Sequence, residues 1–282
     1  MAKLLEGKPI ADKIKTHIAE DIRVLGAKPV LASIIVGNNA GAESYVNSQK
    51  KVAQELGIDY QLHKLDANIL ENDLIQFILE LNNNAVINAI IVQMPLPEQI
   101  DYKKISNFIA PGKDIEGMHP VNIGKVIFGK SKVLPCTVAS IMELLNSTGV
   151  DLCGKEVVVV GHSEIVGKPL ALLLLDKFAT VTVCHIGTSK AGKLEEHVRR
   201  AEVLIVAVGR PELIKGEWIK EGAIVIDVGI NRVGEKIVGD VEFEAAEKRA
   251  SWITPVPGGV GPLTVTMLMR NLVEAVKLQK KE

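Results

Sequence analysis

Apolar residues recur along the chain with two alternating periods, one typical of amphipathic helices and the other of buried strands. The first half predicts helices at residues 7–25, 42–56 and 71–81, and strands at 30–36, 60–65 and 89–93. Gly57 follows the second helix, where a glycine commonly ends one. The second half predicts strands at 157–160, 181–184, 203–208 and 224–228, with helices between them. This alternation favours an α/β fold with mainly parallel sheets.

One helix is expected to link the two domains, and another is expected to return the chain to the first domain. One begins after Thr137, a candidate N-cap, and runs to about residue 145. The other, at about 264–278, follows a Gly/Pro-rich loop and is expected to pack back on the first domain. We therefore predict two domains, one formed by residues 1–140 together with 264–282 and the other, Rossmann-like, by residues 141–263.

Composition narrows the functional classes. The 33 basic residues nearly cancel the 34 acidic ones, so nothing favours nucleic-acid or membrane-surface binding. No apolar run approaches the roughly 20 residues that span a bilayer, and the N-terminal segment lacks a signal-peptide core. Three widely spaced cysteines, Cys136, Cys153 and Cys184, form no CxxC pair, which argues against a zinc ribbon or a disulfide framework. We expect a cytoplasmic protein without a bound metal.

The segment VVVVGHSEIVGKPLALLLL, residues 157–175, is typical of a strand, a tight turn and an apolar helix. Gly161 permits the turn, and Gly167 permits a close approach of the helix to the sheet or of the backbone to a phosphate. Pro169 is tolerated in a first helical turn, whose amides attract a pyrophosphate. Because Ser163 occupies the place of the middle glycine of GxGxxG, a purely structural turn remains an alternative.

The choice of nicotinamide cofactor rests on the end of the second strand of this domain. An acidic residue there would bind the ribose 2′-hydroxyl of NAD, but the strand ends in Cys184, His185 and Ile186. An arginine near the first turn would favour the 2′-phosphate of NADP, and that place holds His162. Lys190 and Lys193 follow in the next loop. We predict NADP over NAD, with NAD as the open alternative.

Seven motifs occur in a fixed order and spacing. They are SYV at 44–46, QMPLP at 93–97, PGKDIEG at 111–117, PCT at 135–137, GHSEIVGKP at 161–169, IDVGIN at 226–231 and PVPGGVGP at 255–262. Together they resemble the bifunctional methylenetetrahydrofolate dehydrogenase/cyclohydrolase family over essentially the whole chain. The resemblance implies a homodimer in which a folate domain, 1–140 with 264–282, faces a dinucleotide domain, 141–263, across a cleft.

The resemblance also assigns site residues. Tyr45 would stack on the pterin, Gln93 would hydrogen-bond it, and Glu116, at a position where the family usually has aspartate, would accept its amino and ring N–H groups. Asp114 is expected to be structural. The expected substrate-binding loop comprises Pro257, Gly258 and Gly259. The expected cofactor-binding residues are Gly161, His162, Ser163, Ile165, Val166, Gly167, Ile186 and Ile230.

The main departure from the family concerns a lysine. The lysine expected one helical turn after Tyr45 is Gln49, and Lys50 and Lys51 point elsewhere around the helix. Hydrolysis of methenyltetrahydrofolate needs proton transfers, which glutamine cannot perform, whereas hydride transfer asks only for positioning. We therefore predict a catalytic site of Tyr45, Gln49, Gln93 and Glu116 with dehydrogenase activity and weak or absent cyclohydrolase activity.

Two other functions remain open on the sequence. A different two-domain nicotinamide-dependent dehydrogenase would need a Lys–Asp or His–Asp pair and an arginine for a substrate carboxylate, and no convincing pair is visible. His119 and His185 are the histidines that invite a direct catalytic role, yet neither has a nucleophile nearby in sequence. A folate- or nucleotide-binding regulator that has lost turnover is the non-enzymatic alternative. The family function would place the protein in one-carbon metabolism, in tetrahydrofolate interconversion and the supply of purine synthesis.

Overall fold

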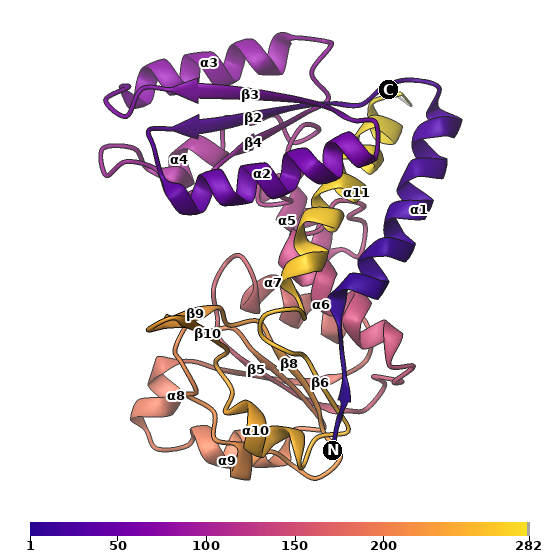
Figure 1. The fold of residues 1–282 in the computed structure, drawn as a ribbon, viewed down its shortest axis with the longest axis vertical. Helices are drawn as coiled ribbons and strands as arrows, with labels where there is room; N and C mark the ends of the chain where they lie inside the picture. The colour runs from indigo at the N-terminus through magenta and orange to yellow at the C-terminus, as the bar shows by residue number, and fades with distance from the viewer. Residues whose placement is uncertain (281–282) are drawn as a thin grey trace. The chain divides into compact units, whose positions relative to one another are not determined.

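The computed structural model describes residues 1–280 and divides into two compact units (Figure 1). One unit contains residues 1–12 and 137–264, and the other contains residues 13–136 and the chain from Val265 onward. Each has its own parallel sheet, as the alternating pattern predicts. Within residues 1–280, no helix is both long enough and apolar enough to span a membrane.

The unit of residues 13–136 has a three-stranded parallel sheet in the order β3-β2-β4. The strands are β2 (Val30–Val36), β3 (Asp59–Leu65) and β4 (Ala89–Val92), and every residue of β2 is buried. One face of the sheet packs against α2 (Ala40–Glu55) and α11 (Gly261–Gln279), and the other against α3 (Glu71–Asn83). Apolar residues on both faces of a parallel strand explain the nearly continuous VLASIIV run.

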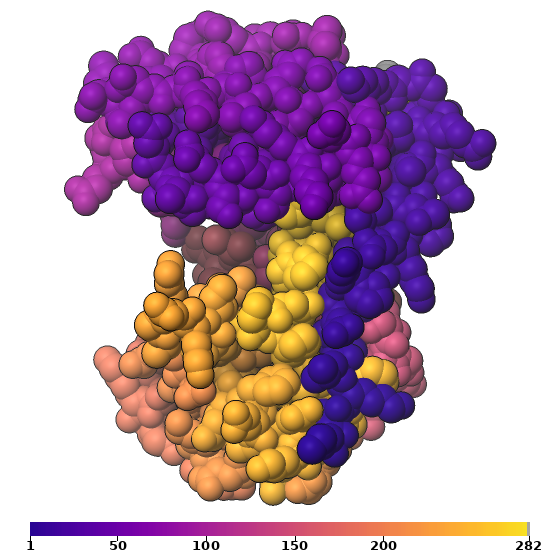
Figure 2. Space-filling model, in the orientation of Figure 1, coloured from indigo at the N-terminus to yellow at the C-terminus, as the bar shows by residue number. Residues whose placement is uncertain are grey.

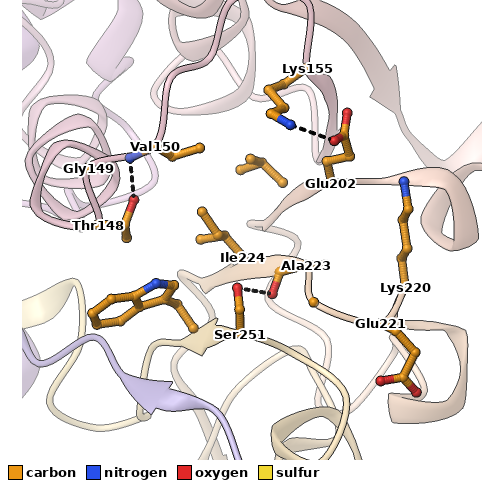
Figure 3. Close-up of a pocket in the computed structure, with 13 residues that line it drawn as sticks. Thr148, Gly149, Val150, Lys155, Glu202, Lys220, Glu221, Ala223, Ile224 and Ser251 are labelled. Atoms are coloured by element: carbon orange, nitrogen blue, oxygen red, sulfur yellow. Dashed lines mark hydrogen bonds and ion pairs between the residues drawn. The ribbon is translucent and has the colours of Figure 1, made fainter.

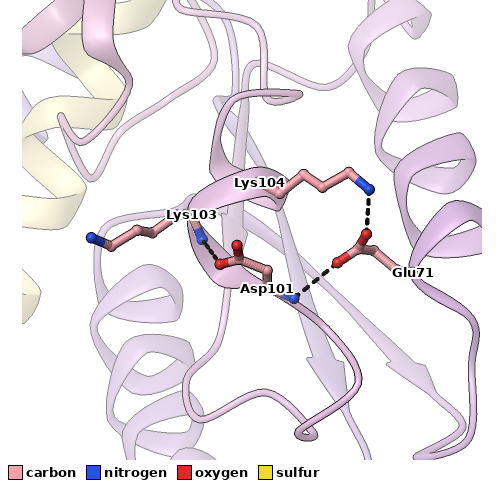
Figure 4. Close-up of polar contacts among 4 residues, drawn as sticks. All are labelled: Glu71, Asp101, Lys103 and Lys104. Carbon is pink, nitrogen blue, oxygen red and sulfur yellow. Dashed lines mark hydrogen bonds and ion pairs between the residues drawn. The ribbon is translucent and has the colours of Figure 1, made fainter.

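Short polar contacts fix the helix ends in this unit. Asn39 caps α2 by accepting a hydrogen bond from the amide of Ala42, and Gly57, at a φ of 72°, follows its last turn. Asp101 caps α4 (Tyr102–Ser106), while Glu71 accepts from the Asp101 amide at 2.9 Å and pairs with Lys104 (Figure 4). The start of α4, and with it Tyr102, is therefore tied to the start of α3.

The other unit has a six-stranded parallel sheet in the order β1-β11-β8-β7-β5-β6. Its strands are β1 (Lys3–Leu4), β5 (Glu156–Val160), β6 (Thr180–Cys184), β7 (Val203–Val206), β8 (Ile224–Asp227) and β11 (Trp252–Ile253). The strands are connected or flanked in the chain by five helices: α6 (Cys136–Ser147), α7 (Gly167–Leu175), α8 (Ile186–Lys190), α9 (Leu194–Arg200) and α10 (Phe243–Glu247). The strand order reverses beside β5, since β6 lies on one side of it and β7 on the other. This arrangement is Rossmann-like.

A two-stranded hairpin, β9 (Asn231–Val233) with β10 (Lys236–Val238), stands apart from this sheet. Its atoms, drawn in orange, lie at the surface in Figure 2. Val233 and Ile237 expose about half of their side chains, at 52% and 45%. The hairpin is too short to have shown a period in the sequence, and it was not predicted.

The long predicted elements are confirmed, and α1 (Gly7–Leu25) and β2 have the bounds that the pattern gave. The role predicted for Thr137 is wrong, because α6 begins one residue earlier, at Cys136. Residues 1–12 group with the six-stranded sheet, because β1 pairs with β11. The structure thus divides the chain after residues 12, 136 and 264. The domain boundaries at 140 and 264 that the sequence suggested stay a prediction.

Candidate functional site

A cavity of about 300 Å³ lies where the strand order of the six-stranded sheet reverses, at the carboxyl ends of β5, β6 and β7. Open α/β sheets bind ligands at such reversal points. The residues that line it come from all three strand ends and from α8 and its surroundings: Val160, Gly161, His162, Ser163, His185, Ile186, Ser189, Leu194, Ala207, Val208, Arg210 and Leu213. Four of the expected cofactor-binding residues are among them.

The two glycines of the turn are required by backbone proximity. A Cβ on Gly161, whose φ is 123°, would lie 2.3 Å from the carbonyl oxygen of Ala207. A Cβ on Gly167 would lie 2.1 Å from the carbonyl oxygen of Gly161. The turn therefore brings strand and helix together at van der Waals distance, and the approach of helix to sheet is one of the two roles that the sequence left open for Gly167.

The start of α7 suits an anion. Its N-cap residue, Val166, has no side-chain cap, and the Val166 amide itself is held by Ser163 Oγ at 3.1 Å. Helix amides that no side chain caps attract phosphate groups. Pro169 lies in the first turn of the helix, as predicted. The residues present therefore fit a dinucleotide: a glycine turn, an uncapped helix start and, among the lining residues in the described part of the chain, no carboxylate.

Two imidazoles face each other in this cavity. The rings of His162 and His185 lie 5.1 Å apart, tilted by 45°. His185 is also the N-cap of α8, because its Nδ1 accepts a hydrogen bond from the Gly187 amide at 3.1 Å. A cap is a structural role that the sequence did not suggest for His185. Of the other expected cofactor contacts, Ile186 lines the cavity, while Ile165 and Ile230 are exposed outside its lining.

A buried amide cluster occupies the other unit. Gln49 is fully buried and Gln93 is 3% exposed. Gln93 Nε2 donates to Gln49 Oε1 at 2.9 Å and to Ser33 Oγ at 3.0 Å, and the Tyr60 hydroxyl donates to Gln49 Oε1 at 2.7 Å. We call Ser33, Gln49, Tyr60 and Gln93 the amide cluster. Each of its members is a neutral group, and burial raises the pKa of Tyr60 to about 12.

Local structure explains why these residues meet. Gln49 lies on the inward face of α2 with Ala42, Val46 and Ala53, so helical periodicity carries it into the core. Gln93 directly follows β4, and its amide donates to the Ile34 carbonyl oxygen at 2.8 Å. Tyr45, one turn before Gln49, is 36% exposed. Lys50 and Lys51 are both exposed, so neither supplies a buried cation, in agreement with the helical geometry.

Glu116 belongs to a second set of polar contacts, with Tyr102 and Asp114. The Tyr102 hydroxyl donates to Glu116 Oε2 at 3.3 Å. Burial, assisted by the nearby carboxylate of Asp114, raises the pKa of Glu116 to about 8. Asp114 itself is structural, because it accepts hydrogen bonds from the amides of Gly117 and His119 and from Asn122 Nδ2, at 2.8 to 3.0 Å.

The glycine-rich loop that includes Pro257, Gly258 and Gly259 packs against the start of α1. The Gly7 amide donates to the Gly258 carbonyl oxygen at 2.9 Å, and a Cβ on Gly7 would lie 1.9 Å from the Gly259 carbonyl oxygen. A Cβ on Gly259 would lie 2.7 Å from Thr254 Cβ. The glycines of this loop thus have a packing role, which agrees with the expectation that they serve shape.

Sequence reasoning missed several neighbours of the expected residues. Ser33 carried the one visible signal, a polar residue in the middle of an apolar strand. No pattern in the sequence pointed to Tyr60, Tyr102 or Arg210. The fold brings Tyr60 to Gln49, Tyr102 to Glu116 and Arg210 to the cavity lining. A second cavity of about 290 Å³, at the amino ends of β5, β7 and β8, contains none of the expected residues; Lys155 pairs there with Glu202 at 2.8 Å (Figure 3).

The fold and the glycine turn define a two-domain α/β protein with a Rossmann-like dinucleotide-binding unit. Family models match both parts of the chain. The catalytic domain of tetrahydrofolate dehydrogenase/cyclohydrolase matches residues 5–116, and the NAD(P)-binding domain of the same family matches residues 135–280. The chain belongs to the tetrahydrofolate dehydrogenase/cyclohydrolase family.

Individual relatives agree over the full length. The bifunctional protein FolD of Acetivibrio thermocellus is 51% identical over 99% of each chain. The structure of the bifunctional methylenetetrahydrofolate dehydrogenase/cyclohydrolase FolD from Campylobacter jejuni superposes with a TM-score of 0.95, at 43% identity, covering 99% of this chain and 100% of that one. The Trypanosoma brucei enzyme, solved with NADP and an inhibitor, gives a TM-score of 0.94 at 38% identity, covering 100% and 99%.

Proposed function

We propose that the protein oxidises 5,10-methylenetetrahydrofolate to 5,10-methenyltetrahydrofolate with NADP or NAD, and that it hydrolyses the product poorly. The observation that carries the first part is the intact glycine turn, in a chain that matches a family of this activity from end to end. The observation that carries the second part is the buried, neutral Gln49.

When bound, the nicotinamide supplies the hydride acceptor, and the protein supplies distance and orientation. The turn from Gly161 to Gly167 and the start of α7 hold the pyrophosphate. Tyr45, with its exposed ring, stacks on the pterin, while Gln93 presents its remaining acceptor capacity to it. Neither role calls for a proton to move.

Glu116 adds a carboxyl group with two forms near neutrality. Because its pKa is about 8, the group is mainly protonated at pH 7 and can donate as well as accept a hydrogen bond. Tyr102 holds one of its oxygens. A protonated carboxyl can donate to one pterin atom while it accepts from another, which an ionised aspartate cannot do.

The cyclohydrolase step is the weaker one in this proposal. Water must attack the methenyl carbon, and protons must move as the ring opens. General acid–base catalysis of such transfers is typically worth about 10²–10⁴-fold. Gln49 Oε1 already accepts two hydrogen bonds, and an amide does not titrate in the relevant range, so the amide cluster can position ligands but cannot shuttle protons.

One assay tests the function. Methylenetetrahydrofolate is added with NADP, and separately with NAD, while the absorbance of reduced nicotinamide and of methenyltetrahydrofolate is followed. We expect both bands to rise together and the methenyl band to persist. Absence of nicotinamide reduction with either cofactor would refute the dehydrogenase, and binding of NADPH without any turnover would favour the regulator. Prompt decay of the methenyl band, well above the uncatalysed rate, would refute the weak hydrolysis.

Three further properties belong to this proposal. We infer NADP as the preferred cofactor, because no carboxylate lines the described cavity where the 2′ position is expected. We infer a homodimer and a cytoplasmic location from the family resemblance. Comparing kcat/KM for the two cofactors tests the first property, since a tenfold preference for NAD would contradict it, and light scattering of the purified protein tests the second.

A further inference from the structure

The loop that directly follows β7 forms one wall of the cofactor cavity, because Ala207, Val208 and Arg210 are among the lining residues. The loop also lies against the glycine turn. A Cβ on Gly161 would lie 2.3 Å from the Ala207 carbonyl oxygen, and the Ala207 amide donates to the Val160 carbonyl oxygen at 2.8 Å. A displacement of the loop would therefore change both the cavity wall and its contact with the turn.

A single buried carboxylate holds this loop. Asp240 is fully buried, and its Oδ2 accepts hydrogen bonds from the amides of Val208 at 2.7 Å and Gly209 at 3.0 Å. Its Oδ1 accepts from the Arg210 amide and from Asn231 Nδ2, both at 2.8 Å. Successive backbone N–H groups that converge on one anion form a concave anion site, and such charge-assisted hydrogen bonds are the stronger ones. The conformation of the loop is thus set by a residue 30 to 32 positions further along the chain.

Asp240 is itself fixed by a second buried carboxylate. Asp227, the last residue of β8, is 4% exposed. Its Oδ1 accepts from the amides of Gly229 at 2.9 Å and Asp240 at 3.0 Å, and its Oδ2 accepts from the Val241 amide at 2.9 Å. A Cβ on Gly239 would lie 1.9 Å from Asp227 Oδ2, so the two carboxylates are closely enclosed by backbone. They differ in what they hold, because the donors to Asp227 lie outside the cavity lining, whereas Asp240 holds the cavity wall.

The same hydrogen bonds decide which charge a ligand would meet. Arg210 lines the cavity and is exposed, and its guanidinium is permanently charged. Asp240 is not among the lining residues, and its two oxygens already accept hydrogen bonds from amide N–H groups. The anion that shapes the wall is therefore in the interior, whereas the cation is on the surface of the wall. An anionic ligand such as a dinucleotide would meet Arg210 and not Asp240.

We propose that Asp240 is a positioning residue for the dinucleotide, which fixes the backbone of residues 208–210 and so holds the cavity wall, with Arg210 on it, against the glycine turn. This inference rests on the proposed dehydrogenase function and adds a residue to its cofactor site. Asp240 acts through the loop and does not touch the ligand. A loop that is already ordered before binding lowers the cost of ordering that the ligand would otherwise have to offset.

Asp240→Asn tests the role with little change of shape. The substitution replaces one acceptor oxygen by an NH₂ group, which cannot accept from the backbone N–H groups that face it. The Kd of NADPH should rise about tenfold, which corresponds to about 1.4 kcal/mol and is close to the worth of one hydrogen bond to a charged group. In turnover the loss should appear in the KM for the cofactor rather than in kcat, and the KM for methylenetetrahydrofolate should not change.

Asp227→Asn is the matched control. It removes a carboxylate that is buried and bonded to three backbone amides, as Asp240 is, but that accepts none from the cavity wall. Both variants are compared at pH 8, where Asp227 is ionised, because burial raises its pKa only to about 6. The free energy of unfolding should fall in both variants, whereas the Kd of NADPH should change by less than about twofold in Asp227→Asn, or about 0.4 kcal/mol.

Hydrogen exchange of the unmodified protein provides a test that no variant has to survive. With no cofactor present, the amides of Val208, Gly209 and Arg210 should exchange at least about 100-fold more slowly than in an unfolded chain, although the last two residues are exposed. Adding NADPH should slow them little further, since the loop is already ordered. Fast exchange without cofactor, followed by protection on binding, would overturn the positioning role, and this measurement decides if Asp240→Asn does not fold.

Binding measurements separate this inference from the proposed function. The Kd of NADPH is measured by cofactor fluorescence with no folate present. If the dehydrogenase assay fails but NADPH still binds and the two variants differ as expected, the function is refuted and the role of Asp240 stands. An unchanged Kd in Asp240→Asn, or an equal rise in both variants, would overturn the role even with robust turnover. A protein that binds neither NADPH nor NADH would refute both.

Discussion

The amide cluster and the histidine pair each bring two nitrogen-bearing side chains together, Gln49 with Gln93 and His162 with His185, yet they differ in what they can do. In the amide cluster, Gln49 and Gln93 are buried, hydrogen-bonded to each other and without a titrating proton. In the histidine pair, His162 and His185 are exposed in a cavity and ionisable. The cluster therefore contributes fixed geometry, whereas the pair presents imidazole rings to a cavity.

The contrast shows that the amide cluster, with Gln49 in it, has no side chain that can transfer a proton near neutral pH. Burial with satisfied hydrogen bonds makes an amide rigid and chemically silent. Gln49 now contacts the Tyr60 hydroxyl and the side-chain oxygen of Gln93, and both oxygen atoms can accept a hydrogen bond from the ammonium group of a lysine at this position. The cluster thus has the acceptors for a cation but holds a neutral side chain.

Gly161→Ala changes the turn that carries His162, and of the substitutions considered it has the largest expected effect. The new Cβ would lie 2.3 Å from the Ala207 carbonyl oxygen at a backbone φ of 123°. Strain of roughly 3 kcal/mol should shift the turn that holds the histidine pair, so the affinity for NADPH should fall at least about 100-fold. Gly261→Ala, where a Cβ meets no atom within 4 Å, is the control. Fluorescence titration with NADPH decides, and near-normal affinity of Gly161→Ala would contradict the assigned turn.

Gln49→Lys places a titratable group in the amide cluster. We expect methenyltetrahydrofolate hydrolysis to rise at least about tenfold, the lower end of what general acid–base catalysis gains when burial lowers a lysine pKa toward neutrality. Decay of the methenyl absorbance, corrected for the uncatalysed rate, measures it. Gln54→Lys adds the same charge on the exposed side of α2 and should change nothing. An unmodified protein that already hydrolyses as fast as it oxidises would show that another residue moves the protons.

Glu116→Gln tests a third kind of group, a carboxyl that is half-buried and has a raised pKa. The pKa of Glu116 is about 8 in the folded protein, above its ordinary 4.5, so the folded state binds a proton that the unfolded chain releases. This contribution to stability is fully present below about pH 4.5 and is lost as the pH rises through 8. The free energy of unfolding of the wild type should therefore decline from pH 5 to pH 9 relative to Glu116→Gln, by about 1 kcal/mol or more. Urea unfolding at each pH measures this, with the exposed Glu20→Gln as the control; parallel profiles would refute the shift.

Tyr60→Phe has the smallest expected effect. It removes the hydroxyl that donates to Gln49 Oε1, while Gln93 still donates to the same oxygen. The free energy of unfolding should fall by about 1 kcal/mol, the net worth of an ordinary hydrogen bond. A double-mutant cycle with Gln49→Met isolates the coupling between the two residues, and additive effects would show that this hydrogen bond contributes nothing.

Sequence periodicity was sufficient for the long elements, because seven or more residues establish a period of 3.6 or reveal a buried run. It failed for short ones such as α4 and the β9–β10 hairpin, which span one turn or three residues per strand. It also failed for β1, whose two residues become a strand only by pairing with β11, some 250 positions away.

The candidate site was predictable in part for a related reason. Gln93 and Gln49 were reached through the family motifs, but their mutual hydrogen bond depends on how α2 packs over β4. Tyr60 joins them from β3, where Leu31 pairs with it across the sheet. Such partners follow from strand register, which one sequence does not reveal. The cap formed by His185 was hidden for a different reason, because α8 is only five residues long and too short to show a helical period.

The chain passes from one compact unit to the other three times, after residues 12, 136 and 264. Helix α1 contributes its first residues to one unit and the remainder to the other, and Gly7 in its first turn is bonded to Gly258. Neither unit is consequently formed by one continuous stretch of the chain. A chimera that exchanges the dinucleotide unit for that of a relative must transplant residues 1–12 together with 137–264, because a swap of the longer segment alone would pair the relative's β11 with this protein's β1.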